Sequence, residues 1–516
     1  MSETFERDAG VTPPPSKFDR IRAQVGAGLA PVVLATLLLV PTPGLETPAH
    51  RLLAVVAFTV ILWICETIPL AITALLGPAL AVALGVGPAK EIFAPFAHPL
   101  IFLFVGAFIL ARALSVHGFD RRAALWLLSR GFVAGSPQRA MTAVAVTAFS
   151  FSMWINNTAT TAMMMPIVLG LCASIREACP DDPKVLETHG RYAEGMLICT
   201  AYAASLGGIC TPVGTAPNLI AIAALDRFAG VTIDFFQWMS FGVPIGSAAL
   251  IALLVFARFY WRPAVSEVTE LDTRVRREFA ELGPMSPKER RSVAIFGLAV
   301  VGWLVPSLIR LGWGPKSELA LWAKSSLPEG VVAITAAALL FVVGRGAPSN
   351  GASPQPLMTW SEAQRIDWGT VYLLGGGLAL GSATVSTGLA EAVGNAVGAA
   401  LGGAPPQWLL IVVVSILVIY LTELVSNTAT TNMMLPIAIP LALAAGHHAL
   451  PVALAVALAA SFAFMLPVST PPNAIVYGSG LVELKSMLRA GIWMNLLALA
   501  LLIFMGIWVL PAIRFQ

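Results

Sequence analysis

Asn157-Thr158-Ala159-Thr160-Thr161 occurs twice in this chain, and the second copy is Asn427-Thr428-Ala429-Thr430-Thr431. Each copy is a short polar segment between long apolar runs, and the copies lie 270 residues apart (427 minus 157). A second pair, Thr215-Ala216-Pro217-Asn218 and Thr470-Pro471-Pro472-Asn473, follows at an offset of 255 (470 minus 215). The sequence is therefore a duplication with its polar motifs at matching places. Duplicated halves with interrupted hydrophobic segments indicate the binding site of a membrane transporter.

The composition is that of a polytopic membrane protein. Of the 516 residues, 57% are hydrophobic and 11% are charged, and the mean hydropathy is +0.81. A membrane-spanning helix needs about 20 apolar residues, so the apolar runs predict an all-α chain with about 11 transmembrane helices. The net charge of +3 is too small to indicate a nucleic-acid-binding protein. The five cysteines lie in or beside apolar runs without metal-ligand spacing, so packing is their expected role.

The distribution of basic residues predicts the topology. Residues 1–24 are expected to form a cytoplasmic tail, and residues 25–260 the first repeat. The basic segment 261–291 is predicted to be a cytoplasmic linker helix, and residues 292–516 the second repeat. Lysine and arginine are absent from Ile366 to Leu484, so we expect the second repeat to be inverted. This topology places the N-terminus in the cytoplasm and the C-terminus outside the inner (plasma) membrane.

Two segments, 139–178 and 405–446, are each predicted to be a re-entrant hairpin with the repeated motif at its tip. The arms of the first segment are expected to be short for a full crossing, and basic residues flank both of its ends. The second segment is expected to enter from the outside. Two further spans, 192–229 and 450–480, are predicted to be broken at the second pair of motifs. Non-helical backbone at membrane depth is tolerated only where it is buried in protein or lines a water-filled cavity.

The predicted tips offer an ion site without a fixed charge. A helix that begins at a tip presents N–H groups to an anion, and a helix that ends there presents carbonyl groups to a small cation. Asn and Thr side chains add amide and hydroxyl groups. Because these ligands are neutral, a cation and an anion should bind better together than alone, which is a physical route to symport. A single Asn-Thr pair is more often a helix–helix hydrogen bond, but two matching copies favour a binding site.

Other functional classes have weaker support in the sequence. Glu66 and Glu423, at the edges of apolar runs, fit either a buried carboxyl bonded to backbone or a proton relay. The duplication does not support the relay, because the counterpart of Glu423 is Met153. We find no nucleophile–base pair, metal-ligand cluster or phosphate loop, which argues against an enzyme, including one acting on lipid. A channel would need a continuous polar pore, whereas polarity here is confined to two tips and two breaks.

At these motifs the chain resembles the divalent anion/sodium symporter family, which carries dicarboxylates, citrate or sulfate. The resemblance covers about residues 50–511. It rests on the intact signature Ser426-Asn427-Thr428 and on the segment from Phe464 to Val476, which reads FMLPVSTPPNAIV. The resemblance implies a homodimer, with a scaffold domain and a transport domain that moves like an elevator.

The resemblance also implies which residues bind the ions, because in the family each tip and the following break form one sodium site. The first site would use Ser152, Asn156, Asn157 and Gly214, and the second Thr422, Ser426, Asn427 and Ser469. The anion would lie between the tips and contact Asn157, Thr158, Thr215, Asn427, Thr428, Thr470 and Pro471. Asn156 stands where the family usually has Ser, so the first site could differ in affinity or ion preference.

The expected function is therefore sodium-coupled import of a divalent anion, with a C4-dicarboxylate such as succinate as the leading substrate. Sulfate and citrate stay open as alternatives, because hydroxyl and amide donors suit these anions too. A sodium-independent dicarboxylate exchanger on the same fold is the second alternative.

Overall fold

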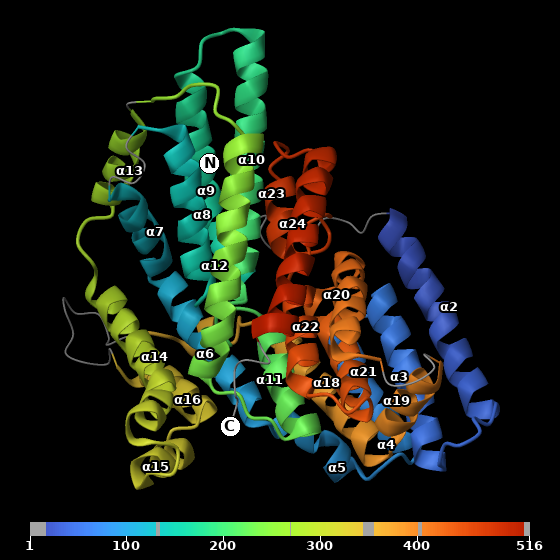
Figure 1. Cartoon of the computed structure of the whole chain (residues 1–516). Coiled ribbons are helices and arrows are strands. Elements are labelled where there is room, and N and C mark those ends of the chain that lie inside the picture. The colour runs from blue at the N-terminus through green and yellow to red at the C-terminus, as the bar shows by residue number, and fades with distance from the viewer. Residues whose placement is uncertain (1–16, 131–134, 269, 344–355, 401–404, 510–516) are drawn as a thin grey trace.

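The computed structural model describes residues 17–130, 135–268, 270–343, 356–400 and 405–509. Within these ranges the regular secondary structure is helical throughout, and the helices form one elongated bundle (Figure 1). The predicted all-α fold is confirmed. The five cysteines are free and buried.

Eight helices in the described ranges are long and apolar enough to cross a membrane. They are α2 (Lys17–Leu39), α3 (Thr47–Cys65), α6 (Pro99–Val116), α9 (Asn157–Glu177), α12 (Phe235–Tyr260), α14 (Pro287–Trp313), α20 (Gln407–Leu424) and α24 (Leu484–Phe504). Two bent pairs add further candidates, α15 (Glu318–Ser326) with α16 (Glu329–Val342), and α18 (Trp368–Ser386) with α19 (Leu389–Ala400). The number and apolar character of these helices agree with a polytopic membrane protein.

The remaining helices are shorter or broken. The predicted broken spans are α10 (Pro183–Gly208) with α11 (Ala216–Ala229), and α22 (Ala449–Ala460) with α23 (Pro471–Tyr477). The first arm of the first hairpin is α8 (Pro137–Ser152), and the second arm of the second hairpin is α21 (Asn427–Ala444). The others are α4 (Leu70–Ala83), α5 (Ala89–Phe93), η1 (Ala94–Ala97), α7 (Phe119–Ser129), α13 (Glu270–Glu281), α17 (Trp360–Ala363) and the π-helical η2 (Met505–Val509).

Two expectations about element lengths were wrong. The first helix begins at Lys17, inside the segment 1–24 that was expected to be a tail, and residues 1–16 of that segment lie outside the described ranges. The second arm of the first hairpin is not short, because α9 runs through Pro166 to Glu177 and is long enough to cross a membrane alone. Proline therefore does not end the apolar helix here.

The duplication is visible helix by helix. Helices α8 and α20 begin 270 residues apart (407 minus 137), and so do α9 and α21 (427 minus 157). Helices α11 and α23 begin 255 residues apart (471 minus 216), and α4 and α16 have 14 residues each. The inversion of the second repeat stays a prediction.

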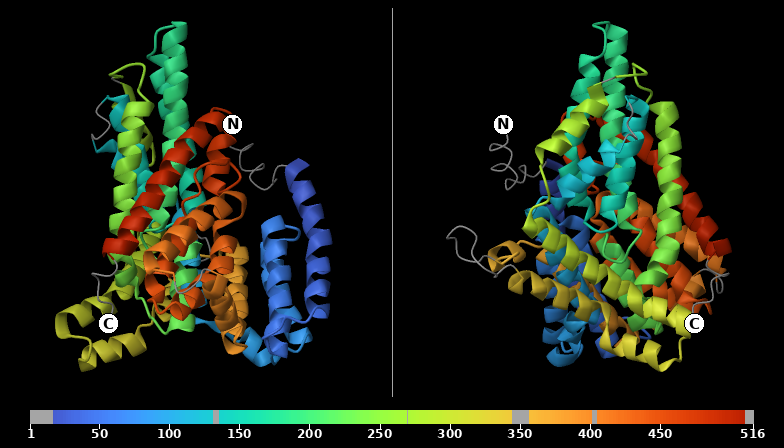
Figure 2. Two further views of the ribbon diagram at one scale, coloured as in Figure 1. Left: turned by 45° about the vertical axis from the view of Figure 1, so that its right-hand side comes forward. Right: turned by 90° about the vertical axis from the view of Figure 1, so that its left-hand side faces the viewer.

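Helix α10 lies at the centre of the bundle, and its residues from Tyr192 to Gly208 are all buried. It packs against α8 and α9, which lie side by side, and also against α12 and α23 (Figure 1). The two halves exchange contacts, because α9 of the first packs on α23 of the second, and α21 of the second packs on α11 of the first. Figure 2 shows α2 beside α3 at one edge of the bundle, and the connection from α9 to α10 projecting at one end.

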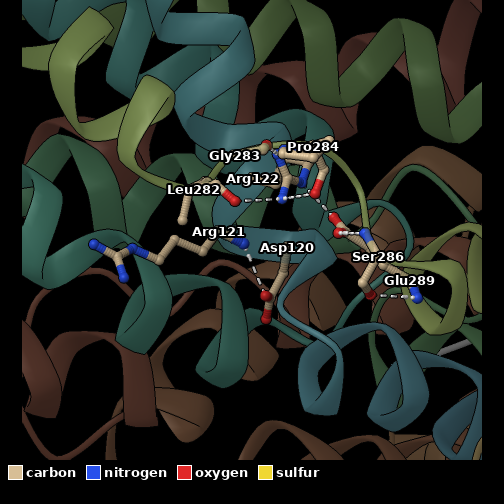
Figure 3. Close-up of polar contacts among 8 residues, drawn as sticks. All are labelled: Asp120, Arg121, Arg122, Leu282, Gly283, Pro284, Ser286 and Glu289. Carbon is tan, nitrogen blue, oxygen red and sulfur yellow. Dashed lines mark hydrogen bonds and ion pairs between the residues drawn. The ribbon is translucent and has the colours of Figure 1, made fainter. Parts of the chain in front are cut away.

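An arginine joins the first half to the segment between the repeats. Arg122 on α7 donates to Glu289 Oε1 at 2.6 Å and to the carbonyl of Gly283 at 2.6 Å (Figure 3). Glu289 also completes the capping box at the start of α14 with Ser286. Both charged side chains are largely buried, with 13% of Arg122 and 3% of Glu289 exposed. The pair therefore fixes α7 to the turn between α13 and α14.

Candidate functional site

The first tip lies between the end of α8 at Ser152 and the start of α9 at Asn157. The Ser152 hydroxyl donates a hydrogen bond to Asn157 Oδ1 over 2.7 Å. The side chain of Asn156 caps α9 by accepting from the backbone N–H of Ala159 at 2.8 Å. Gly208 at the end of α10 permits close contact, since a Cβ atom there would lie only 2.3 Å from Asn157 Oδ1. The amide of Asn157 is therefore fixed between α8 and α10.

The second tip repeats this geometry. The Thr422 hydroxyl donates to Asn427 Oδ1 at 2.8 Å and lies 2.8 Å from the carbonyl oxygen of Ala460. The side chain of Ser426 caps α21 by accepting from the backbone N–H of Ala429 at 3.3 Å. The hydroxyl-to-asparagine bond joins residues five apart in both tips, and the capping bond joins residues three apart in both. The asparagine that begins each hairpin's second helix is thus held by a hydroxyl at the end of the first.

The two breaks are also built alike. Asn218 Nδ2 donates to the carbonyl groups of residues 208 and 211 at 2.9 and 2.7 Å. Asn473 Nδ2 donates to the corresponding carbonyl groups of residues 463 and 466 at 3.0 and 3.1 Å. Both amides are fully buried, and within the described part of the chain neither Oδ1 atom has a hydrogen-bond partner. Each break therefore presents a buried amide oxygen that is free to accept.

The other predicted site residues lie at the starts of α11 and α23. A Cβ atom at Gly214 would lie 2.9 Å from the carbonyl oxygen of Ser152, so the first break touches the first tip. The matching position in the second break is Ser469, whose hydroxyl donates to the carbonyl of residue 466 at 2.7 Å. The N-caps of α11 and α23 and the first residue of α23 are Thr215, Thr470 and Pro471.

The exchanged packing pairs helices that carry predicted residues of opposite halves, α9 with α23 and α11 with α21. The side chains at the tips are accessible despite the buried surroundings. Asn157, Asn427 and Thr428 are half-buried, and Thr158 is exposed. An ion can therefore reach side chains whose backbone is fixed by buried hydrogen bonds.

Glu423 holds the second break and was not among the predicted site residues. Its carboxylate is 3% exposed. It accepts from the backbone N–H groups of residues 464, 465 and 466 at 2.9–3.1 Å and from Asn495 Nδ2 at 2.8 Å. This is the backbone-bonded carboxyl, one of the two alternatives that the sequence left open. In the first half the counterpart of Glu423 is Met153. Its backbone carbonyl accepts from the Thr211 hydroxyl, so the first tip and the first break are also joined by a hydrogen bond.

Arg22 on α2 also reaches the second tip. Its guanidinium lies 2.8 Å from the Glu66 carboxylate and donates to the carbonyl of Leu424 at 2.9 Å. Glu66 caps α3 with a φ of 45°, the left-handed region that side chains other than glycine rarely adopt. The last turn of α20 is therefore linked to α2 and α3 by one cation. The sequence did not predict this contact, because Arg22 is one of several basic residues in a polar segment near the N-terminus.

The chemistry of the tips suits an alkali cation better than a transition metal. Carbonyl, hydroxyl and amide oxygens are hard ligands. Within the described residues there is no group of three or more His, Cys, Asp or Glu that could hold a metal ion. The two helix starts at Asn157 and Asn427 supply N–H donors for an anion beside these oxygens.

Comparisons with known proteins agree with this picture. Residues 24–513 match the family model described as "Sodium:sulfate symporter transmembrane region". The sodium-dependent dicarboxylate transporter SdcS of Staphylococcus saprophyticus is 31% identical over 492 residues, which cover 95% of this chain and 92% of that protein. SdcS of Staphylococcus aureus strain USA300 is also 31% identical, over 495 residues, covering 95% of this chain and 91% of that one.

Two solved structures share the fold at low sequence identity. The YdaH transporter of Alcanivorax borkumensis has a TM-score of 0.53 and 14% identity, covering 96% of this chain and 98% of that chain. MtrF of Neisseria gonorrhoeae has a TM-score of 0.53 and 11% identity, covering 92% of this chain and 97% of that chain. Both likenesses concern the arrangement of helices alone.

Proposed function

Because this chain belongs to the sodium:sulfate symporter family, we propose that it is a sodium-coupled symporter that imports a C4-dicarboxylate such as succinate. The family membership makes the chain a multi-pass membrane transporter and not an enzyme. The dicarboxylate is favoured because the SdcS proteins, which align over almost the whole chain, are sodium-dependent dicarboxylate transporters. We place the protein in the inner (plasma) membrane, with the N-terminus in the cytoplasm and the C-terminus outside.

The observation that supports the ion sites most is the matched pair of hydrogen bonds at the tips, Ser152 to Asn157 and Thr422 to Asn427. Each bond brings a hydroxyl oxygen and an amide oxygen together at a tip. The helix that ends at the tip also presents carbonyl groups there. We assign one sodium ion to each tip. The first is held by Ser152, Asn156, Asn157 and Gly214, and the second by Thr422, Ser426, Asn427 and Ser469.

The anion binds between the tips. One carboxylate of the substrate meets the start of α9 and the other meets the start of α21, where N–H groups and threonine hydroxyls donate. The residues assigned to it are Asn157, Thr158, Thr215, Asn427, Thr428, Thr470 and Pro471. No lysine or arginine is among them, so the sodium ions supply the compensating charge. Coupling follows from this, because the anion binds weakly until the cations are present.

Transport requires the loaded site to face the two sides of the membrane in turn. We propose an elevator motion, in which the helices around α10 move with their ions against a scaffold within a homodimer. Support comes from family membership and from the packing of the buried helix α10 against α8 and α9 of the first tip and against α23 of the second half. A dianion whose two charges are neutralised by bound sodium ions also crosses a low-dielectric barrier at a lower free-energy cost than the dianion alone.

The test is uptake of radiolabelled succinate by proteoliposomes that contain the purified protein. We expect accumulation only with an inward sodium gradient, with inhibition by excess unlabelled dicarboxylate. Sulfate and citrate are added as competitors, and stronger inhibition by either than by succinate would reassign the substrate. Equal uptake in sodium and choline would contradict sodium coupling.

The sodium-independent exchanger is the alternative that Asn156 keeps open. The amide oxygen of Asn156 caps α9 as the hydroxyl of Ser426 caps α21, so the substitution preserves the local structure. Counterflow distinguishes the two functions. Succinate exchange into succinate-loaded vesicles without sodium would identify an exchanger, whereas a symporter requires sodium on both sides.

A further inference from the structure

A cavity of about 750 Å³ lies away from the tips, where the end of α9 and the start of α10 face the segment that leads into α24. Its lining includes residues of α9 and α10 on both sides of their connection, and this connection projects at one end of the bundle (Figures 1 and 2). None of the residues assigned to sodium or to the transported anion lines it. Any ligand of this cavity therefore binds a separate site.

Basic side chains outnumber acidic ones in the lining of the cavity. Among the described residues, its lining includes four permanent cations and three carboxylates. One of the carboxylates, Glu194, is buried and accepts the backbone N–H of Glu483 at 2.7 Å, so it is already bonded. Asp181 contacts Arg176 at 3.1 Å, but this aspartate is 89% exposed and such pairs contribute little. The lining cations are Arg176, Arg191, Lys485 and Arg489.

A buried imidazole also faces the cavity. His189 is 8% exposed, and its Nδ1 atom is buried without a hydrogen-bond partner in the described part of the chain. Burial, and then the charge of Arg176, lower the pKa of His189, so at neutral pH the ring is neutral and can donate one hydrogen bond. The imidazole of His189 is therefore a donor in the lining of the cavity.

Part of the cavity lining is apolar. Leu169, Cys172 and Ala173 of α9 form one side, and Leu481 lies on the segment opposite. Tyr260 and Trp261, at the end of α12, add two aromatic rings. Tyrosine and tryptophan are typical of the membrane–water interface. The cavity therefore offers both cations and apolar surface to a ligand.

We propose that this cavity binds the phosphodiester headgroup of an anionic phospholipid. The guanidinium groups of Arg176 and Arg489 and the ammonium group of Lys485 contact the phosphate, and His189 donates to one of its oxygens. The apolar part of the lining covers the glycerol and the first methylene groups. A free phosphate ion shares the polar contacts but leaves this part unused, so the lipid is the better occupant. The inference does not depend on which anion the protein transports.

The experiment measures lipid binding by native mass spectrometry of the full chain in a neutral detergent. The probes are short-chain phosphatidylglycerol, short-chain phosphatidylcholine and inorganic phosphate, each titrated separately at two salt concentrations. We expect phosphatidylglycerol to bind at least about tenfold more tightly than phosphatidylcholine, with a preference that falls as salt rises. Inorganic phosphate should compete only weakly.

The variant that tests the site is Arg176→Gln/Lys485→Gln/Arg489→Gln, which should reduce the lipid preference to within about twofold, since each juxtamembrane cation contributes about 1 kcal/mol. The matched control is Arg277→Gln/Lys288→Gln/Arg291→Gln, which removes the same charge from exposed positions outside the cavity and should keep the preference. His189→Phe is the second variant, and it should weaken binding without a change of charge.

Three results would overturn the proposal. Equal binding of the two lipids would exclude recognition of anionic lipid, and an unchanged preference in the triple variant would place recognition elsewhere. Strong competition by inorganic phosphate would identify a site for soluble anions. If the triple variant does not fold, the His189→Phe variant and the three single substitutions decide the question.

Discussion

At the scale of single residues, the asparagines at the two tips are the central groups. Sequence comparison of the two halves identified both, because duplication repeats the motif and the offset between copies marks it as a unit. The structure adds the partners, a hydroxyl five residues earlier in each case. These partners were also within reach of the sequence, since Ser152 and Thr422 occupy matching positions.

Replacing Asn157 or Asn427 with alanine should abolish sodium-driven succinate uptake while the protein stays folded. Each substitution removes an amide that is proposed to bind both a sodium ion and the anion, and a lost hydrogen bond to a charged group is worth about 1.5–3 kcal/mol, or roughly 10- to 100-fold in binding. Initial rates in proteoliposomes measure the effect.

The control for these variants is Thr142→Ala on α8, whose hydroxyl bonds only the carbonyl of Gln138 on its own helix. It should transport at the wild-type rate. Wild-type uptake by either asparagine variant would refute the assignment of the tips.

Glu423 shows where the sequence stops being informative. Its role depends on three consecutive backbone N–H groups about forty residues later in the chain. Comparison of the two halves could not predict this role, because the counterpart Met153 has no carboxylate. We expect Glu423→Gln to destabilise the protein by about 1–3 kcal/mol, because an amide cannot accept all these bonds.

Glu423→Gln should also weaken the sodium dependence of uptake, since the second break carries Ser469. Thermal unfolding and a sodium titration measure the two effects. The matched variant is Met153→Gln, which alters the same position of the first half without removing a charge. An equal loss in both variants would show that the carboxylate has no special role.

At the scale of helices, hydrophobic runs gave the order and type of the elements, but their ends were less certain. Helix α2 begins within the expected tail, because its polar first turns pack beside α3 and Arg22 reaches Glu66. Helix α9 extends past its proline and past its apolar part. Such ends are decided by contacts between distant segments, which leave no periodic pattern in either segment.

The turn between α13 and α14 offers a test at this scale. Arg122→Met leaves Glu289 buried without its partner, which we expect to cost about 3–5 kcal/mol. The double variant Arg122→Met/Glu289→Leu should recover part of this loss. The neighbouring Arg121→Met removes an exposed cation from the same helix and should have little effect (Figure 3).

Thermal unfolding of the wild type, Arg122→Met, Glu289→Leu and the double variant measures the coupling between the two side chains, and Arg121→Met is the control. Additive losses in the double variant would mean that the pair does not stabilise the junction. The buried position of Glu289 could not be predicted, because in the sequence it is one acid among many charged residues of the linker.

At the scale of the molecule, mutual neutralisation of ions predicts cooperative ligand binding. Sodium and succinate together should raise the unfolding temperature by more than the sum of their separate effects. A ligand at 100 times its dissociation constant stabilises by about 2.7 kcal/mol, and each ion lowers the dissociation constant of the other.

The measurement is thermal unfolding in sodium or choline, with and without succinate. In Asn427→Ala the excess stabilisation should disappear. Strictly additive shifts in the wild-type protein would contradict coupling through a shared site.

The contacts exchanged between α9 and α23 and between α21 and α11 bear on how such a chain could have arisen. A half-length ancestor would have lacked the helices that the opposite half now packs against α9 and α21, so its polar tip would have stayed uncovered on that side. Only a pair of ancestral subunits could have enclosed a solute. Fusion of two copies into one chain would make that partnership permanent and would let the two tips diverge, as they do at Glu423 and Met153.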